Sequence, residues 1–260
     1  MAESWKSKAR AAGVLICLAG AMALWTKPAL SAKRSSERHV ETASASASKA
    51  SASGSATSAP SNSPAVVAHY GRLPLAFEPN VSHPESGVQY LAHGNGYTIF
   101  IGPNDAALAL KGSSSSAVLH MKLSGGNATN ALIASDELPG KSNYILGSNP
   151  ENWRINVPNY GKVSQHGVYP GIDVVYYGTQ RNLEYDFVVA PQANPRAIRF
   201  ALDGADNLRI DSRGDLLVEL AGSAVRLQKP VAYQELEGNR QLVDVKYLVK
   251  DNREVTFAIA

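Results

Sequence analysis

The sequence predicts an all-β domain, an antiparallel β-sandwich-like fold built from many short strands. From Tyr97 onward, β-branched and aromatic runs alternate with Gly, Asn, Asp and Pro about every eight to twelve residues, a spacing typical of sandwiches and barrels. No apolar stripe at helical spacing competes with these runs. The 260 residues include one cysteine, Cys17, so we expect a hydrophobic core rather than disulfides to hold the domain together.

The expected strands follow one another as a meander of hairpins. Leu208 and Ile210, a turn over residues 211–214, and the apolar alternation of residues 216–220 predict one such hairpin. Polar residues alternate with apolar ones along 241–249, which predicts a strand with one wetter side. The other expected strands are residues 97–101, 118–123, 172–177, 183–189, 198–202, 224–228 and 254–259.

Residues 1–32 have the organisation of a secretory signal peptide. Lys6, Lys8 and Arg10 precede an apolar run of roughly fifteen residues, the order of a signal peptide's basic and apolar regions. The run is shorter than the about twenty apolar residues that span a bilayer. Small residues at 29–32 provide a peptidase site, so we expect cleavage and an exported, extracellular or cell-envelope protein. An uncleaved leader is the alternative, and the only expected link to a membrane.

A disordered Ser/Ala-rich linker is expected at residues 33–68, ahead of an all-β domain at residues 69–260. Residues 42–59 contain a single charged residue, Lys49, and no aromatic residue. Such a composition buries too little apolar surface to offset the entropy of ordering. The segment is therefore expected to act as a flexible tether.

The charge distribution excludes a basic nucleic-acid-binding domain. The formal net charge of +3 arises in the first 68 residues, because residues 69–260 hold 17 basic and 19 acidic side chains. The six histidines are scattered singly along the chain, without the spacing of a zinc site. We therefore expect neither a metal nor a cofactor.

Three carboxylates, those of Asp173, Glu184 and Asp186, are candidates for acid–base chemistry. Glycoside hydrolysis uses two carboxylates at a fixed separation, so a carbohydrate-active hydrolase is a rival hypothesis. Whether the three can converge depends on how residues 172–177 pair with residues 183–189.

The expected pairing is a hairpin around a five-residue loop at 178–182. In that register Tyr177 faces Leu183, and Asp173 faces Phe187. Asp173 would then lie on the face opposite to that of the other two carboxylates. A one-residue bulge would bring all three together. The expected register therefore favours a domain that is not an enzyme.

Aromatic residues cluster in the same region and include three candidates for ligand binding, Trp153, Tyr176 and Tyr177. Exposed rings on a sheet can hold sugars or peptides, so a glycan- or peptide-binding module is a further alternative. Buried cross-strand aromatic pairs are the commoner use of such residues.

Several long motifs carry a resemblance to a known family. The motifs are LPGKSNY at 138–144, VYPGIDVVYYG at 168–178, LEYDFVV at 183–189 and KPVAYQ at 229–234. With these motifs the sequence resembles an uncharacterised N-terminal domain of exported bacterial proteins, which usually precedes SBBP-type β-propeller repeats. The resemblance covers roughly residues 72–260 and offers no catalytic residues.

The resemblance implies a β-propeller as the partner, although this chain stops where relatives continue through another strand into the propeller. Either the domain is truncated at its C-terminus or it works alone. We expect a non-catalytic, secreted structural or binding module whose partner is a β-propeller domain, a cell-surface glycan or a cell-surface protein.

Overall fold

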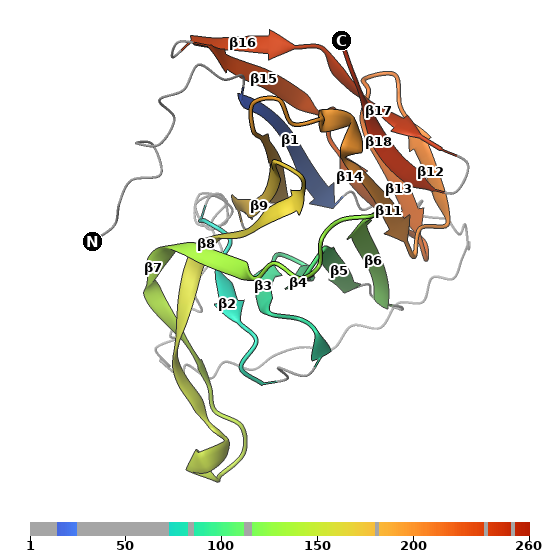
Figure 1. Cartoon of the computed structure of the whole chain (residues 1–260). Helices are drawn as coiled ribbons and strands as arrows, with labels where there is room; N and C mark the ends of the chain where they lie inside the picture. The colour runs from blue at the N-terminus through green and yellow to red at the C-terminus, as the bar shows by residue number, and fades with distance from the viewer. Residues whose placement is uncertain are drawn as a thin grey trace, which may run out of the picture.

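The computed structural model describes residues 15–24, 73–82, 86–111, 116–179, 182–236, 239–250 and 253–260, with the backbone alone at 15–24, 116 and 236. Within these residues the elements are β-strands and short 3-10 helices, which confirms the predicted all-β class (Figure 1). The expected linker at 33–68 lies outside the described residues. So does the expected leader, apart from residues 15–24.

Eighteen strands and two 3-10 helices make up the described chain. The first nine strands are β1 (Leu15–Leu24), β2 (Phe77–Pro79), β3 (Tyr90–Gly94), β4 (Tyr97–Gly102), β5 (Asp105–Lys111), β6 (Ser116–Leu123), β7 (Leu132–Tyr144), β8 (Arg154–Tyr169) and β9 (Ile172–Thr179). The other nine are β10 (Asn182–Val189), β11 (Arg199–Asp203), β12 (Asn207–Ile210), β13 (Leu216–Leu220), β14 (Ser223–Leu227), β15 (Val231–Leu236), β16 (Asn239–Val243), β17 (Val245–Val249) and β18 (Glu254–Ile259). The helices are η3 (Pro150–Asn152) and η4 (Pro195–Ala197).

Most expected strands have a counterpart within two residues, but the strand expected at 241–249 is wrong. The chain there forms β16 and β17, separated by Asp244. The break occurs because the chain changes neighbour: Val243 pairs with Ala232 of β15, whereas Val245 pairs with Ile259 of β18. Alternation of polarity alone does not show such a change of partner.

All strands belong to one large antiparallel sheet. Among the strands from β2 to β9, β8 pairs with three neighbours, β7, β9 and β2. Strands β2 to β6 follow one another as a meander. β11 then joins the two halves, because Phe200 lies opposite both Leu123 of β6 and Val255 of β18.

The sheet curls around one hydrophobic core, so that strands that are not paired face each other. Tyr185 of β10 lies edge-on to Phe200 of β11, with ring centroids 6.4 Å apart. Phe187 of β10 meets Phe257 of β18 at 6.3 Å. Edge-to-face pairs of buried rings add specific contacts to the burial of apolar area. These rings therefore connect β10 to the opposite side of the sheet.

The predicted register of the hairpin between β9 and β10 is wrong by one residue. Pairing continues to Thr179 and Asn182, and two residues rather than five separate the strands. The reason is Gly178, which lies opposite Leu183. A Cβ at this position would stand 2.2 Å from the carbonyl oxygen of Asn182, so only glycine lets the two backbones pair this closely. Because of this shift, the β9 side chains that were expected on the same face as Leu183, Tyr185 and Phe187 lie on the opposite face.

None of the described residues forms a helix long and apolar enough to cross a membrane.

Replacing Gly178 with alanine is expected to disrupt the closing pairs of this hairpin. The added methyl group collides with backbone rather than with a flexible side chain, so we expect a loss of about 1–3 kcal/mol in the free energy of unfolding. Chemical denaturation of the purified protein measures this loss. Gly140→Ala in β7 is the matched control, because its Cβ would meet open space and change stability by no more than about 0.5 kcal/mol.

Candidate functional site

The observed register places all three candidate carboxylates on the outer face of β9 and β10. Glu184 lies opposite Tyr177, and Asp173 lies opposite Val188, two residues along from Asp186. Residues paired across antiparallel strands, and those two apart on one strand, share a face. Asp173 and Asp186 are thus diagonal neighbours with Cα atoms roughly 7–8 Å apart, whereas Asp173 and Glu184 lie roughly 13 Å apart along the strands.

The carboxylate of Asp173 fixes an irregular part of β8. Its Oδ2 atom lies 2.8 Å from Nδ1 of His166, and its Oδ1 atom accepts a hydrogen bond of 2.7 Å from the backbone N–H of Gly167. These residues lie where the register between β8 and β9 shifts. An irregularity of this kind leaves backbone groups without ladder partners. Asp173 supplies one of the missing acceptors, which is a structural role.

The carboxyl group of Asp186 binds the hydroxyl of Tyr177. The Tyr177 hydroxyl donates to Oδ1 of Asp186 at 3.1 Å. Burial is the main reason that the pKa of Asp186 is raised, and the neighbouring charge of Glu184 raises it further. The same burial, together with Asp186, raises the pKa of Tyr177 above its ordinary value of 10.0.

The outer face holds no group suited to a metal ion. Throughout the part of the chain that the structure describes, no three His, Cys, Asp or Glu side chains come close enough together to hold one.

The three aromatic candidates lie in three different places. Tyr176 is 1% exposed and belongs to the core, so its ring is not available to a ligand. Tyr177 is half-buried on the outer face beside Asp186. Trp153 follows η3, far along the hairpin of β7 and β8, and its Nε1 atom donates to the carbonyl oxygen of Gly147 at 3.2 Å. The three rings do not form one binding surface.

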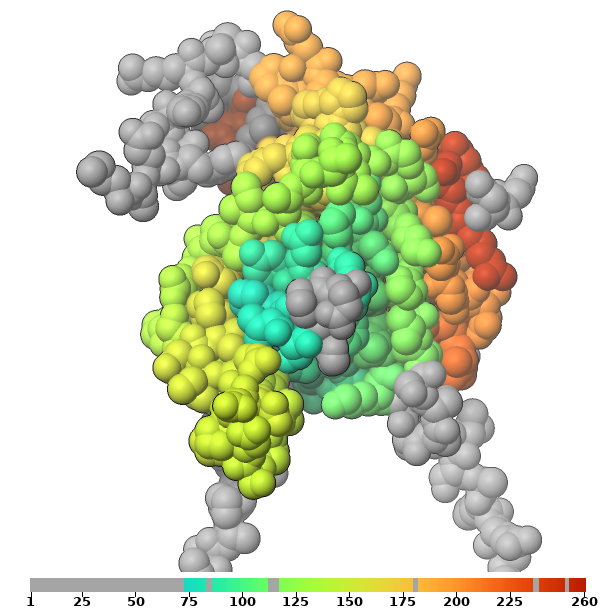
Figure 2. Space-filling model, turned by 60° about the horizontal axis from the view of Figure 1, so that its bottom comes forward, coloured from blue at the N-terminus to red at the C-terminus, as the bar shows by residue number. Residues whose placement is uncertain are grey.

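The hairpin of β7 and β8 projects from the body of the domain (Figures 1 and 2). Near its outer end, the Tyr144 hydroxyl donates to the carboxylate of Glu78 in β2. Glu78 is 3% exposed, and its other oxygen, Oε2, has no hydrogen-bond partner. A buried carboxylate that loses a hydrogen-bond donor is strongly destabilised, so the bond from Tyr144 is costly to break. It therefore ties the projecting hairpin to the sheet.

Large aliphatic side chains are exposed at the tip of this hairpin. Ile145, Leu146 and Ile155 are 58%, 59% and 60% exposed. The tip has an ordered backbone: Asn149 accepts a hydrogen bond from the N–H of Glu151 and thereby caps η3. The capped turn therefore exposes three large apolar side chains to water, and exposed apolar surface of this kind commonly marks an interaction site.

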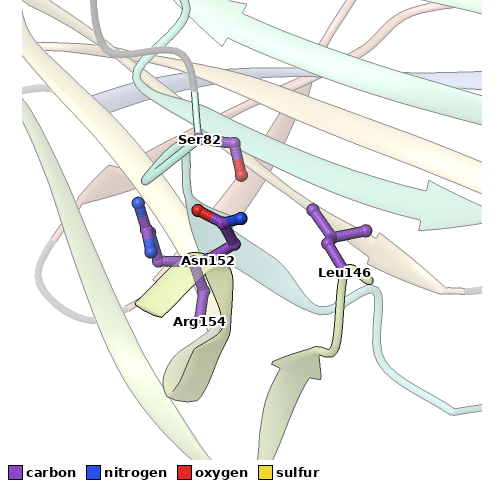
Figure 3. A pocket seen from close by; sticks show the side chains of 4 residues that line it. All are labelled: Ser82, Leu146, Asn152 and Arg154. Carbon is purple, nitrogen blue, oxygen red and sulfur yellow. The ribbon is translucent and has the colours of Figure 1, made fainter. Parts of the chain in front are cut away.

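A shallow hollow lies against the tip and has a volume of about 330 Å³ (Figure 3). Leu146 lines one side of it, and Asn152 and Arg154 face it from the other, with Ser82 above. The Arg154 guanidinium is held by the carbonyl oxygens of Glu151 and Trp153, at 3.2 and 3.3 Å. The hollow thus joins an aliphatic wall to a cation and an amide.

The sequence singled out Trp153, which lies at this tip, as a candidate for ligand binding. It did not single out the aliphatic residues of the tip. The signal was the pair Ile145-Leu146, which stands directly before Gly147 among Ser, Asn and Pro residues. Apolar residues in a run of turn-forming residues are poorly placed for the core, which indicates exposure.

Comparison with known families gives a match to the family described as a domain of unknown function (DUF7948) over residues 77–260. Neither the curated proteins nor the solved structures contain a significant match to the chain.

The raised pKa of Asp186 predicts a pH-dependent stability. Because its pKa in the folded protein lies above the ordinary value of 3.8, the folded state holds the proton more tightly than the unfolded state. The ionised carboxylate therefore destabilises the fold at pH 7, and this effect fades as the pH falls through the folded-state pKa. Asp186→Asn should be more stable than the native protein at pH 7, by a margin that shrinks towards pH 4.

Urea unfolding at several pH values between 7 and 4 measures this margin. The exposed Asp244→Asn variant controls for the exchange of a carboxylate for an amide. A margin for Asp186→Asn that grows as the pH falls would contradict the prediction.

Proposed function

The chain belongs to the DUF7948 family of domains of unknown function, and we propose that it is a non-catalytic structural or binding module of an exported protein. The observation that carries the proposal is the projecting hairpin of β7 and β8, whose tip exposes Ile145, Leu146 and Ile155. The contact between Tyr144 and Glu78 supports it, because it holds the tip in a defined position.

The chemistry of the tip favours a protein partner over a glycan. Aliphatic side chains gain free energy by leaving water, at about 25 cal/mol per Å² of apolar area, but they offer no flat ring for a sugar to stack on. The ring of Trp153, also at the tip, is only partly exposed and is held by its hydrogen bond to Gly147. Arg154 and Asn152 lie at the rim of the adjacent hollow, where polar groups commonly orient a partner. An apolar centre with a polar rim is the usual anatomy of a protein interface.

The proposal includes the organisation of the whole exported protein. The curled sheet forms a β-sandwich-like domain, in which β10 packs across the core from β11 and β18. Residues 1–32 direct export, and residues 33–68 tether the domain. The partner is the β-propeller domain that the sequence resemblance implies.

A non-catalytic role agrees with the arrangement of the carboxylates. Asp173 already binds His166 and Gly167, so it is not free for acid–base work. The hollow at the hairpin tip is lined by none of the three candidate carboxylates.

Serine substitution of the three tip residues tests the proposal. In calorimetric titrations with a purified SBBP-type β-propeller protein, the full chain should bind, and the triple variant Ile145→Ser, Leu146→Ser, Ile155→Ser should bind at least tenfold more weakly. Tenfold is a lower bound, because burying even one such side chain contributes about 1.5–3 kcal/mol.

The matched control changes three aliphatic residues that are also exposed but lie elsewhere on the sheet, Ile133, Ile210 and Leu248. This control triple should bind the propeller like the native chain. Absence of binding by the native chain, or equal weakening by both triples, would refute the proposal.

A hydrolase is the alternative function, and the shared face of the three carboxylates is the observation in its favour. Burial raises the pKa of Asp186, and a carboxyl group with a raised pKa is what a glycosidase uses as its general acid. Release of reducing sugar from polysaccharides, lost in both Glu184→Gln and Asp186→Asn, would establish this alternative. The exposed Glu235→Gln variant serves as the control.

Glycan or peptide binding without chemistry is the second alternative, and it rests on the partly exposed ring of Trp153 beside the hollow. Oligosaccharide binding that is lost in Trp153→Ala but retained in the tip triple would favour it.

A further inference from the structure

Strand β1 fills a gap between two parts of the sheet. It pairs with β10 over eight positions, from Ile16 opposite Val189 to Ala23 opposite Asn182. On its other side it pairs with five positions of β15 and three of β14. Figure 1 shows β1 in blue beside β14 and β15. Since β1 is antiparallel to both sides, β10 runs parallel to β14 and β15.

Without β1 these two edges have no other strand to pair with among the described residues. The remaining neighbour of β10 is β9, that of β14 is β13, and that of β15 is β16. The edges lie two strand spacings apart, roughly 9.5 Å, which is too far for direct hydrogen bonds. The gap therefore has room for one strand, and β1 lies antiparallel to both of its edges.

The side chains that border the gap belong to the hydrophobic core. On β10 they include Leu183, Tyr185 and Phe187, and across the gap they include Leu227 and Ala232, all buried. An empty gap would expose these side chains and leave two rows of backbone groups unpaired. Open edges of this kind pair readily with another chain.

We propose that the gap is a strand-acceptor site, and that an extended apolar strand of a partner polypeptide occupies it once residues 1–32 have been removed. The register defines what such a strand must contain. It runs antiparallel to β10, and its residues opposite Leu183, Tyr185 and Phe187 are apolar. Its alternate residues lie beside Glu184 and Asp186, which disfavours acidic side chains there.

The segment now in the gap has large apolar residues at two of these three positions and Gly20 at the third, opposite Tyr185. Residues 15–24 contain no charged residue, and Leu18 and Met22 occupy the positions opposite Phe187 and Leu183. The sequence also predicts that this segment is cleaved off with the leader. A mature domain that lost it would need another strand to close the same gap.

The acceptor site does not involve the tip of the β7–β8 hairpin. Only the release of β1 rests on the proposed export, and the in-trans tests below do not require export. The three tip substitutions, added to the double-proline chain described below, should leave its strand binding unchanged, so failure of one proposal is distinguishable from failure of the other.

A disulfide test establishes whether β1 occupies the gap in the full chain. Val188 lies opposite Cys17, the single cysteine, so Val188→Cys should form a disulfide with it under mild oxidation. Val175→Cys is the matched control, because this valine is also half-buried on the outer face but lies one strand further from β1. Equal cross-linking of both variants, or of neither, would contradict the assignment.

A second test supplies the strand in trans. The full chain carrying Leu18→Pro and Gly20→Pro loses backbone donors in β1 and should vacate the gap. A synthetic peptide of residues 14–25 should bind this variant one to one and raise its melting temperature. The unmodified chain should bind the peptide at least tenfold more weakly, because its tethered β1 competes at an effective concentration in the millimolar range.

If the double-proline chain does not fold alone, the measurement becomes recovery of its β-sheet circular dichroism when it is refolded with the peptide. Recovery with the native peptide, but not with one carrying the same two prolines, supports the acceptor site. Equal peptide binding by both chains, or no binding and no recovery, would overturn it.

Discussion

The close approach of two backbones at Gly178 sets the register on which the rest of the domain depends. Because glycine has no Cβ, the carbonyl of Asn182 can lie against it and the hairpin can close over two residues. Alternation along β10 then turns Leu183, Tyr185 and Phe187 into the core. The rings of Tyr185 and Phe187 meet Phe200 of β11 and Phe257 of β18, so these contacts across the core depend on the register of one short hairpin.

That register also determines what the acidic residues do. It gathers Asp173, Glu184 and Asp186 on one face, which a slip of one residue would have prevented. Their hydrogen bonds then separate their roles. Asp173 supports the irregular backbone of β8, whereas Asp186 is held against Tyr177. Sharing a face is therefore not sufficient for shared chemistry, because each carboxylate is oriented by its own neighbours.

Alternation in the sequence predicted the strands whose two faces differ clearly. β10 is the clearest example, since every second residue from Leu183 to Val189 is buried. The long strands β7 and β8 were missed, because Pro139, Gly140 and Pro158 are typical of loops. The structure accommodates Pro139 and Gly140 where the register of β7 against β8 shifts.

The candidate site was less predictable than the fold. Which side chains of β10 share a face with Tyr176 and which with Tyr177 depends on a steric contact at Gly178 that no periodicity reveals. The exposure of Ile145 and Leu146 depends on a hairpin whose strands were not expected.

The pairing of β6 with β11 has a consequence for the speed of folding. Leu123 and Phe200 lie opposite each other although β7, β8, β9 and β10 intervene in the sequence. Closing so long a loop is entropically unfavourable until many contacts form together, so domains dominated by such pairings fold slowly. Strands β2 to β6 therefore complete their side of the sheet only after β11 has been synthesised. Under the proposed export, such a delay would keep the polypeptide extended for longer while it crosses the membrane.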